Sequence, residues 1–172
     1  MKNLLFIIGL TLTLTAQAQK VKLVDTMDRY KMNIERLEET GDCTVRAIAE
    51  GFNMTYMEAY KITQDMGRVK GTGMGLRAYV RGLSRTFYKD IVHGSNVNAP
   101  TNAQGFVDTI AEDGYSYIVV SAAHTFVIEQ GHGTVRGKSN VKTNDKWFVK
   151  GNYDDKKKDI LMYVKIKNDY KK

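Results

Sequence analysis

The two halves of the chain carry different hydrophobic patterns, and this difference constrains the fold more than any other feature. In the first half, apolar residues recur at helical spacing. The segments are residues 25–39, 42–51, 55–67 and 76–83. In the second half, the apolar segments are rich in β-branched and aromatic residues, which is typical of strands. These segments are residues 115–120, 124–128, 147–149 and 160–166. Helices followed by strands, without a repeating βαβ pattern, predict an α+β fold with N-terminal helices packed on a C-terminal antiparallel sheet.

The remaining segments are shorter. Val21, Leu23 and Val24 predict an opening strand, and residues 87–92 predict a strand followed by a loop at 93–100 that holds the only proline. A fifth helix is expected to begin near residue 101 and to bury its apolar side. Thr55 followed by Glu58 forms a capping-box pattern at the start of the third helix.

Residues 67–75 are rich in glycine but lack the Gly-Lys-Ser/Thr ending of a phosphate-binding loop. We therefore expect a surface loop, and the alternative is a loop that lines a substrate site.

The first eighteen residues have the pattern of a secretory signal peptide. Lys2 is followed by a short apolar segment and by the small residues Ala16 and Ala18. The apolar segment is too short to span a bilayer, for which about 20 residues are needed. We therefore expect cleavage near Ala18, a secreted or periplasmic protein, and no stable membrane insertion. Residues 19–172 show no repeat or low-complexity linker and are predicted to form a single domain.

The net charge of +7 comes partly from lysine clusters at 156–158 and 171–172. Such clusters are usually solvated, and the alternative is that they bind an acidic polymer, an acidic protein partner or an anionic membrane surface. We expect no nucleic-acid partner.

Cys43 is the only cysteine of the chain. A lone thiol cannot form an intramolecular disulfide, and its retention in an exported protein favours a chemical use. It follows Gly41 and Asp42 and precedes an apolar segment at helical spacing, so it is predicted to open a helix whose N-terminus would stabilise a thiolate. Asp42 is the expected N-cap, with its carboxylate accepting from an early backbone N–H. The alternative is an inert, buried cysteine.

His124 is the histidine best placed to serve Cys43, because it lies within a segment that is predicted to be a strand. An imidazole beside a thiol acts as general base and then as general acid. A third group often accepts from the second ring N–H of the histidine. Asn140 is the first choice, and Asn144 and Asp145 are the alternatives. The spacing of the single cysteine and the three histidines matches no common metal-ligand pattern, so we expect neither a metal nor another cofactor.

The segment Gly-Asp-Cys-Thr-Val-Arg-Ala-Ile around Cys43 resembles the nucleophile segment of small papain-like cysteine peptidases of the bacterial and phage-associated type. The later Ala-His-Thr-Phe-Val-Ile, which contains His124, is similar to the histidine segment of the same superfamily. The resemblance spans residues 41–140. It implies a papain-like fold, a Cys-His dyad or triad, and thiol-dependent cleavage of an amide bond in a peptide or protein substrate.

Papain-like enzymes usually carry a glutamine before the nucleophile, where its amide completes the oxyanion hole. Residues 37–40 contain no glutamine. Asn33, the Thr40 hydroxyl or backbone N–H groups are the candidate replacements.

The leading hypothesis is an exported cysteine peptidase or related amidohydrolase, with Cys43 as nucleophile and His124 as general base and acid. One alternative is a catalytically idle binding module on the same scaffold. Another is a secreted inhibitor or immunity-type protein whose basic surface binds an acidic partner.

Overall fold

The computed structural model describes residues 21–24, 26–122, 124–130, 147–151 and 159–167. Within these residues the chain forms five helices and six strands, which confirms the α+β prediction. The elements, in order, are β1 (Lys22–Val24), α1 (Met27–Leu37), α2 (Cys43–Gly51), α3 (Tyr56–Asp65), α4 (Leu76–Thr86), β2 (Ile91–Thr101), α5 (Ala103–Thr109), β3 (Tyr115–Ser121), β4 (Thr125–Gln130), β5 (Trp147–Lys150) and β6 (Ile160–Lys167). The predicted signal peptide lies outside the described residues.

The six strands form one sheet in the order β1-β5-β4-β3-β6-β2. All neighbours are antiparallel except β1, which pairs parallel with β5. The centre of the sheet is β3, whose residue Ile118 is opposite Val127 on β4 and Val164 on β6. Since these strands are nearly continuous runs of β-branched and aromatic residues, both faces of the sheet are suited to burial.

The expected loop at 93–100 is wrong, because β2 runs without a break from Ile91 to Thr101. β2 is an edge strand, and Pro100 is tolerated there because an edge strand needs fewer backbone donors. The pairing with β6 is also irregular between Asn96 and Thr101, so the strand leaves the regular ladder just where the proline lies. Proline and glycine in this segment therefore mark a sheet edge.

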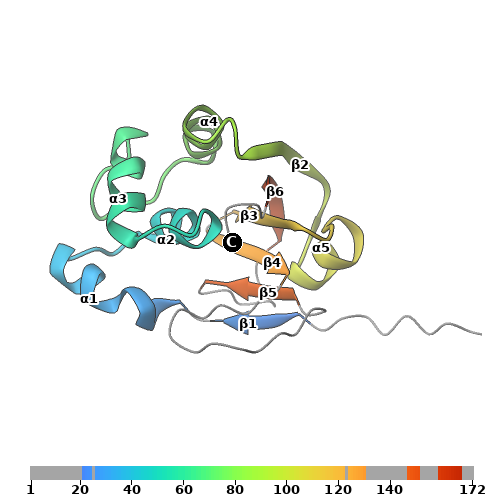
Figure 1. Cartoon of the computed structure of the whole chain (residues 1–172), viewed down its shortest axis with the longest axis horizontal. Coiled ribbons are helices and arrows are strands. Elements are labelled where there is room, and N and C mark those ends of the chain that lie inside the picture. The colour runs from blue at the N-terminus through green and yellow to red at the C-terminus, as the bar shows by residue number, and fades with distance from the viewer. Residues whose placement is uncertain (1–20, 25, 123, 131–146, 152–158, 168–172) are drawn as a thin grey trace, which may run out of the picture.

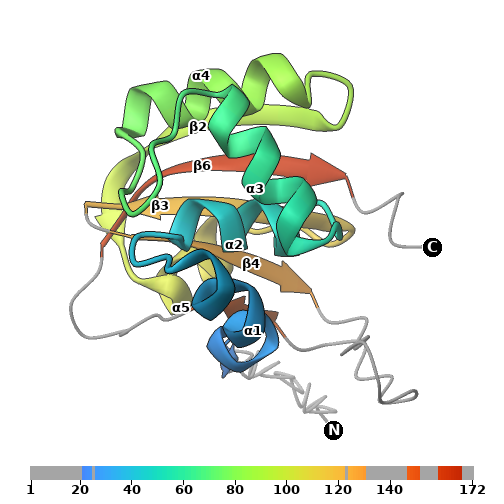
Figure 2. The same cartoon turned by 90° about the vertical axis from the view of Figure 1, so that its left-hand side faces the viewer.

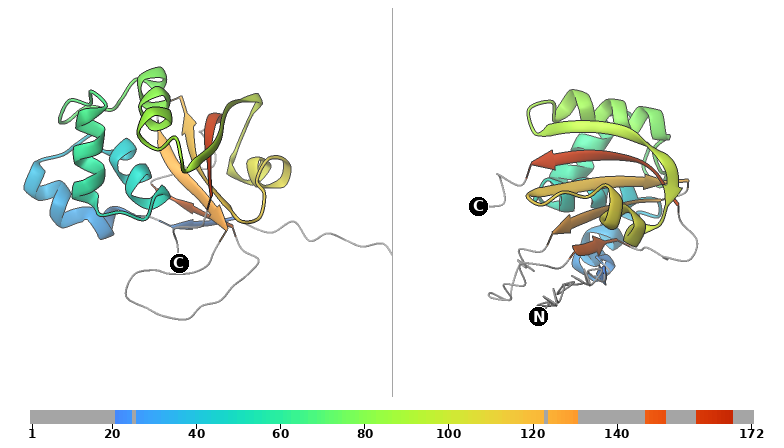
Figure 3. Two further views of the ribbon diagram at one scale, coloured as in Figure 1. Left: turned by 45° about the horizontal axis from the view of Figure 1, so that its top comes forward. Right: turned by 90° about the vertical axis from the view of Figure 1, so that its right-hand side faces the viewer.

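Four helices cover one face of the sheet and α5 covers the other (Figures 1 and 3). α2 is the helix closest to the centre of the sheet, and it contacts both β3 and β4. Gly51, its last residue, allows this approach: an added Cβ would lie 2.8 Å from the Ile118 side chain. α1 and α3 lie outside α2, and α4 lies beside β2 (Figure 2).

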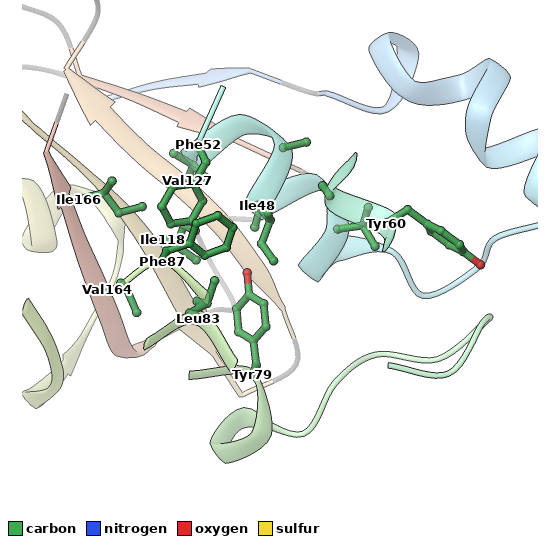
Figure 4. Close-up of a cluster of buried hydrophobic side chains, with 14 of the residues drawn as sticks. Ile48, Phe52, Tyr60, Tyr79, Leu83, Phe87, Ile118, Val127, Val164 and Ile166 are labelled. Carbon is green, nitrogen blue, oxygen red and sulfur yellow. The ribbon is translucent and has the colours of Figure 1, made fainter. Parts of the chain in front are cut away.

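The sheet therefore has two cores. The first lies between the sheet and α1–α4, where Phe52 and Phe87 stack with ring centroids 3.7 Å apart. Figure 4 shows these two rings next to Ile118 and Val127, with Leu83 and Tyr79 of α4 below them in the view. The second core lies between the sheet and α5, and Phe106 is its fully buried centre. Residues of β3 and β4 alternate between the two cores, as the two-residue period of a strand requires.

The boundaries of α2 and α3 agree with the capping and spacing patterns in the sequence. Thr55 accepts from the Glu58 N–H at 3.3 Å, and Glu58 accepts from the Thr55 N–H at 2.8 Å, so the predicted capping box is confirmed. α2 begins at Cys43 and ends at Gly51, as the sequence predicts. None of the helices in the described part of the chain is long and apolar enough to cross a bilayer.

Candidate functional site

Cys43 is the first residue of α2, and its side chain is partly exposed while most of the helix behind it is buried. Val45 and Ile48 anchor the helix in the first core. The next carbonyl, that of Thr44, accepts from the Tyr79 hydroxyl at 3.3 Å, which ties α4 to the start of α2. Burial, and secondarily the neighbouring Cys43, raise the pKa of Tyr79 well above its ordinary value, so this hydroxyl remains a donor. The thiol thus lies at the accessible end of a rigid helix.

Asp42 occupies the N-cap position, but its carboxylate makes no capping hydrogen bond to α2. It accepts instead from Arg46 at 3.1 Å and from the Tyr56 hydroxyl at 3.1 Å, and all three side chains are buried. The expected side-chain cap is therefore wrong, because two buried donors compete for the carboxylate. Burial and the charge of Asp42 also raise the pKa of Tyr56, which keeps the phenol protonated. The negative charge next to Cys43 is balanced by Arg46.

A second buried ion pair lies just before Cys43. Arg68 donates to Glu39 at 2.6 Å, and neither side chain has any exposed area. Arg68 also donates to the Gly41 carbonyl at 3.0 Å, and the Gly71 N–H donates to Glu39. Burial opposes ionisation of Glu39, but the hydrogen bonds from Arg68 and Gly71 outweigh it and lower the pKa below its ordinary value. We call these contacts the Glu39–Arg68 latch.

The latch holds the glycine-rich loop against the segment that leads to Cys43. Thr40 donates to the Gly71 carbonyl at 3.2 Å. A Cβ on Gly41 would lie 2.9 Å from the carbonyl carbon of Thr72, so the close contact requires glycine at this position. The prediction of a loop is confirmed, and its first turn is more tightly anchored than its composition indicates.

His124 lies at the turn between β3 and β4, and its carbonyl accepts from the Ser121 N–H at 2.8 Å. Its ring lies beside that of Phe126, with centroids 6.1 Å apart, and Phe126 belongs to the second core. A Cβ atom added to Gly151 would lie 3.8 Å from the His124 Nε2 atom, and it would also contact Phe126. The His124 ring thus lies on the side of the sheet that α5 covers, whereas α2 and Cys43 lie on the opposite side.

The other predicted site residues are spread over the molecule. Asn140, Asn144 and Asp145 lie outside the described residues. Asn33 is partly buried on α1, and Thr40 is exposed with its hydroxyl bonded to Gly71. The described part of the chain contains no group of three metal-ligating side chains.

The contacts around Cys43 include two residues that the sequence interpretation did not assign to the site. Glu39 and Arg68 are 29 positions apart and belong to no periodic pattern. The sequence indicates a role for these two residues only indirectly, because each lies within a few residues of a glycine where a turn was expected.

A groove of about 450 Å³ is present elsewhere, between β2, β6 and α5. Its walls are uncharged, and it contains none of the predicted site residues. It includes Ser95, Asn96, Asn98, Thr109 and Tyr163.

No known protein family, curated protein or solved structure matches the chain.

Proposed function

We propose that the protein is a papain-like, thiol-dependent amide hydrolase with Cys43 as its nucleophile and a peptide or protein as its substrate. The observation that carries the proposal is the position of Cys43 at the partly exposed start of the otherwise buried helix α2. Backbone N–H groups converge at a helix start and stabilise a thiolate there. The signal-peptide pattern adds the proposal that the enzyme acts outside the cytoplasm.

The charge distribution around the thiol supports this chemistry. An ionised Asp42 next to the nucleophile would oppose a developing oxyanion, because a carboxylate can only accept hydrogen bonds. Here Arg46 and Tyr56 engage that carboxylate. The Cys43 backbone N–H remains the proposed oxyanion donor. Thr40 is a weaker candidate than its sequence position indicates, because its hydroxyl donates to Gly71.

In the proposed reaction, His124 takes the thiol proton and the Cys43 sulfur bonds to the substrate carbonyl carbon. The tetrahedral intermediate then loses its amine, which receives the proton from His124, and water hydrolyses the acyl-enzyme. Asn140 is proposed to orient the imidazole. The reaction requires the His124 ring to leave the α5 side of the sheet and meet Cys43, so a local change at the β3–β4 turn is part of the proposal.

A thiol-directed electrophile tests the proposal. A reactive thiolate should be alkylated by iodoacetamide at pH 6 faster than free cysteine, whose pKa is about 8.5. Cys43→Ala should abolish labelling, and His124→Ala should slow it about tenfold or more while leaving the fold intact. His93→Ala, on β2, is the matched control and should not change the rate. Labelling of the wild type no faster than free cysteine would remove the basis for catalysis.

The position of the His124 ring favours a second candidate, a catalytically idle binding module on the same scaffold. In that case iodoacetamide labels Cys43 no faster than free cysteine, and Cys43→Ala and His124→Ala capture a peptide partner as tightly as the wild type does. Loss of peptide cleavage in both variants, with the wild type active, would exclude this candidate.

A further inference from the structure

α4 carries a row of three arginines that the fold does not use. Arg77, Arg81 and Arg85 are spaced four residues apart and are all exposed, whereas Tyr79 and Leu83 on the opposite side of the helix are buried. At a rise of 1.5 Å per residue, neighbouring arginines are about 6 Å apart and the row is about 12 Å long. Figure 2 shows α4 at one edge of the molecule, beside β2, and the exposure of the three arginines places the row on the side of α4 away from the first core. We call it the α4 arginine row.

The row destabilises the helix that carries it. Like charges at i and i+4 repel each other, and the row contains two such pairs. The helix dipole does not offset this repulsion, because it disfavours Arg77 in the first turn about as much as it favours Arg85 in the last turn. α4 contains no acidic residue, and no described carboxylate forms an ion pair with any of the three arginines. A solvated helix face usually mixes charges of both signs, so this arrangement indicates a binding function.

We propose that the α4 arginine row binds a linear acidic polysaccharide. Guanidinium groups bind carboxylates and sulfates through paired N–H donors. Three of them in a line match charges that repeat along an extended chain, whereas a single small anion would be held by a cluster. The inference does not depend on any reaction at Cys43.

Three other partners fit the row less well. The other exposed residues of α4 are Ala78, Ser84 and Thr86, so the helix offers no large exposed apolar side chain to enter a bilayer or to anchor a protein interface. Binding of single-stranded nucleic acid uses aromatic rings interleaved with basic residues. The exposed ring closest along the chain is Tyr88, which lies beyond the end of α4 and has the Lys89 ammonium 5.6 Å above it.

Heparin is the probe for the test, and calorimetry from about 50 to 200 mM NaCl is the measurement. The full chain is compared with the triple variant Arg77→Gln, Arg81→Gln, Arg85→Gln. Its affinity for heparin should fall about tenfold or more at low salt. The slope of log Kd against log salt should fall by about 2 to 3, since three anion contacts are lost.

The control variant has the same net charge. It carries Lys31→Gln, Lys61→Gln and Lys70→Gln, three exposed lysines outside α4. It should bind heparin within about twofold of the wild type, since these lysines lie outside the proposed site. A single reversal, Arg81→Glu, provides a second test, because the new carboxylate can pair with Arg77 and Arg85, keep the helix folded and still weaken binding.

Two results would overturn the proposal. Equal losses in the arginine and lysine variants would mean that only net charge matters. Tighter binding of the wild type to single-stranded DNA, to polyglutamate or to phosphatidylglycerol vesicles than to heparin at matched charge would assign the row to another class of partner.

Discussion

The Glu39–Arg68 latch can be tested by breaking it from one side. Arg68→Met removes the charge and the donors while keeping a side chain of similar length, and Glu39 is left buried with the Gly71 N–H. Because both side chains of the pair are fully buried, loss of one partner should cost about 3–5 kcal/mol of unfolding free energy. In a domain of this size, Tm should fall by about 6–20 °C. Urea unfolding followed by circular dichroism measures the cost.

The neighbouring pair Glu38–Lys70 is the matched control. It joins the same two segments at 3.7 Å, but its side chains are 87% and 51% exposed. Lys70→Met should therefore cost less than about 1 kcal/mol. The double variant Glu39→Gln, Arg68→Met should recover much of the single loss, because it leaves no buried charge. If Arg68→Met costs no more than Lys70→Met, the buried latch does not stabilise the fold more than an exposed ion pair does.

The latch should also depend on pH in a defined direction. The pKa of Glu39 is lowered below 4.5 in the folded protein, so its contribution is fully present above that pH. It is lost as the pH falls through the folded pKa, when the carboxyl becomes protonated. The difference in stability between the wild type and Arg68→Met should therefore shrink in acid, and a difference that grows below pH 4.5 would contradict the assignment.

Three further substitutions test other contacts. Gly41→Ala should cost about 1–3 kcal/mol and expose the 67–75 loop to limited proteolysis, because its Cβ meets the Thr72 backbone; an unchanged digestion pattern would contradict this. Thr55→Ala should cost about 1 kcal/mol in urea unfolding, because the capping box is lost, and a neutral result would show that the box adds nothing. Glu50→Ala should cost about 3–5 kcal/mol of unfolding free energy. The buried Glu50 carboxylate pairs with Arg29, accepts from the Tyr30 hydroxyl at 2.7 Å and lies 3.4 Å from the Lys150 ammonium. A loss below about 1 kcal/mol in thermal unfolding would contradict a stabilising role for this carboxylate.

Local signals were sufficient to predict much of the fold. Thr55 and Glu58 satisfy each other within one turn, and the start of α2 depends on residues adjacent to Cys43, so both could be predicted from short segments. Most of β2, from residue 93 on, could not be predicted in this way. Its glycine and proline indicate a loop locally, and only pairing with β6, whose residues lie 59 to 75 positions later than their partners, makes the segment a strand.

In the candidate site, too, the features that depend on neighbouring residues could be predicted and those that depend on distant residues could not. The sequence predicts Cys43 at a helix start because the apolar residues that follow it recur at helical spacing. The direction of the His124 ring depends on where the residue lies relative to β4, which begins at Thr125, and this register is set by pairing across β3 and β4. The contact between Glu39 and Arg68 joins a helix end to a loop, where no periodic pattern exists to indicate burial.

The place of β6 in the sheet has a consequence for how the chain assembles. β6 is the last of the described strands in sequence, yet it lies between β3 and β2. During synthesis β2 emerges about 60 residues before the strand that must pair with it, so its edge and the neighbouring edge of β3 stay unpaired. Contacts this distant in sequence close slowly. Assembly of the sheet is therefore expected to follow synthesis of β6, whose insertion is a late step that joins β2 to the rest of the sheet.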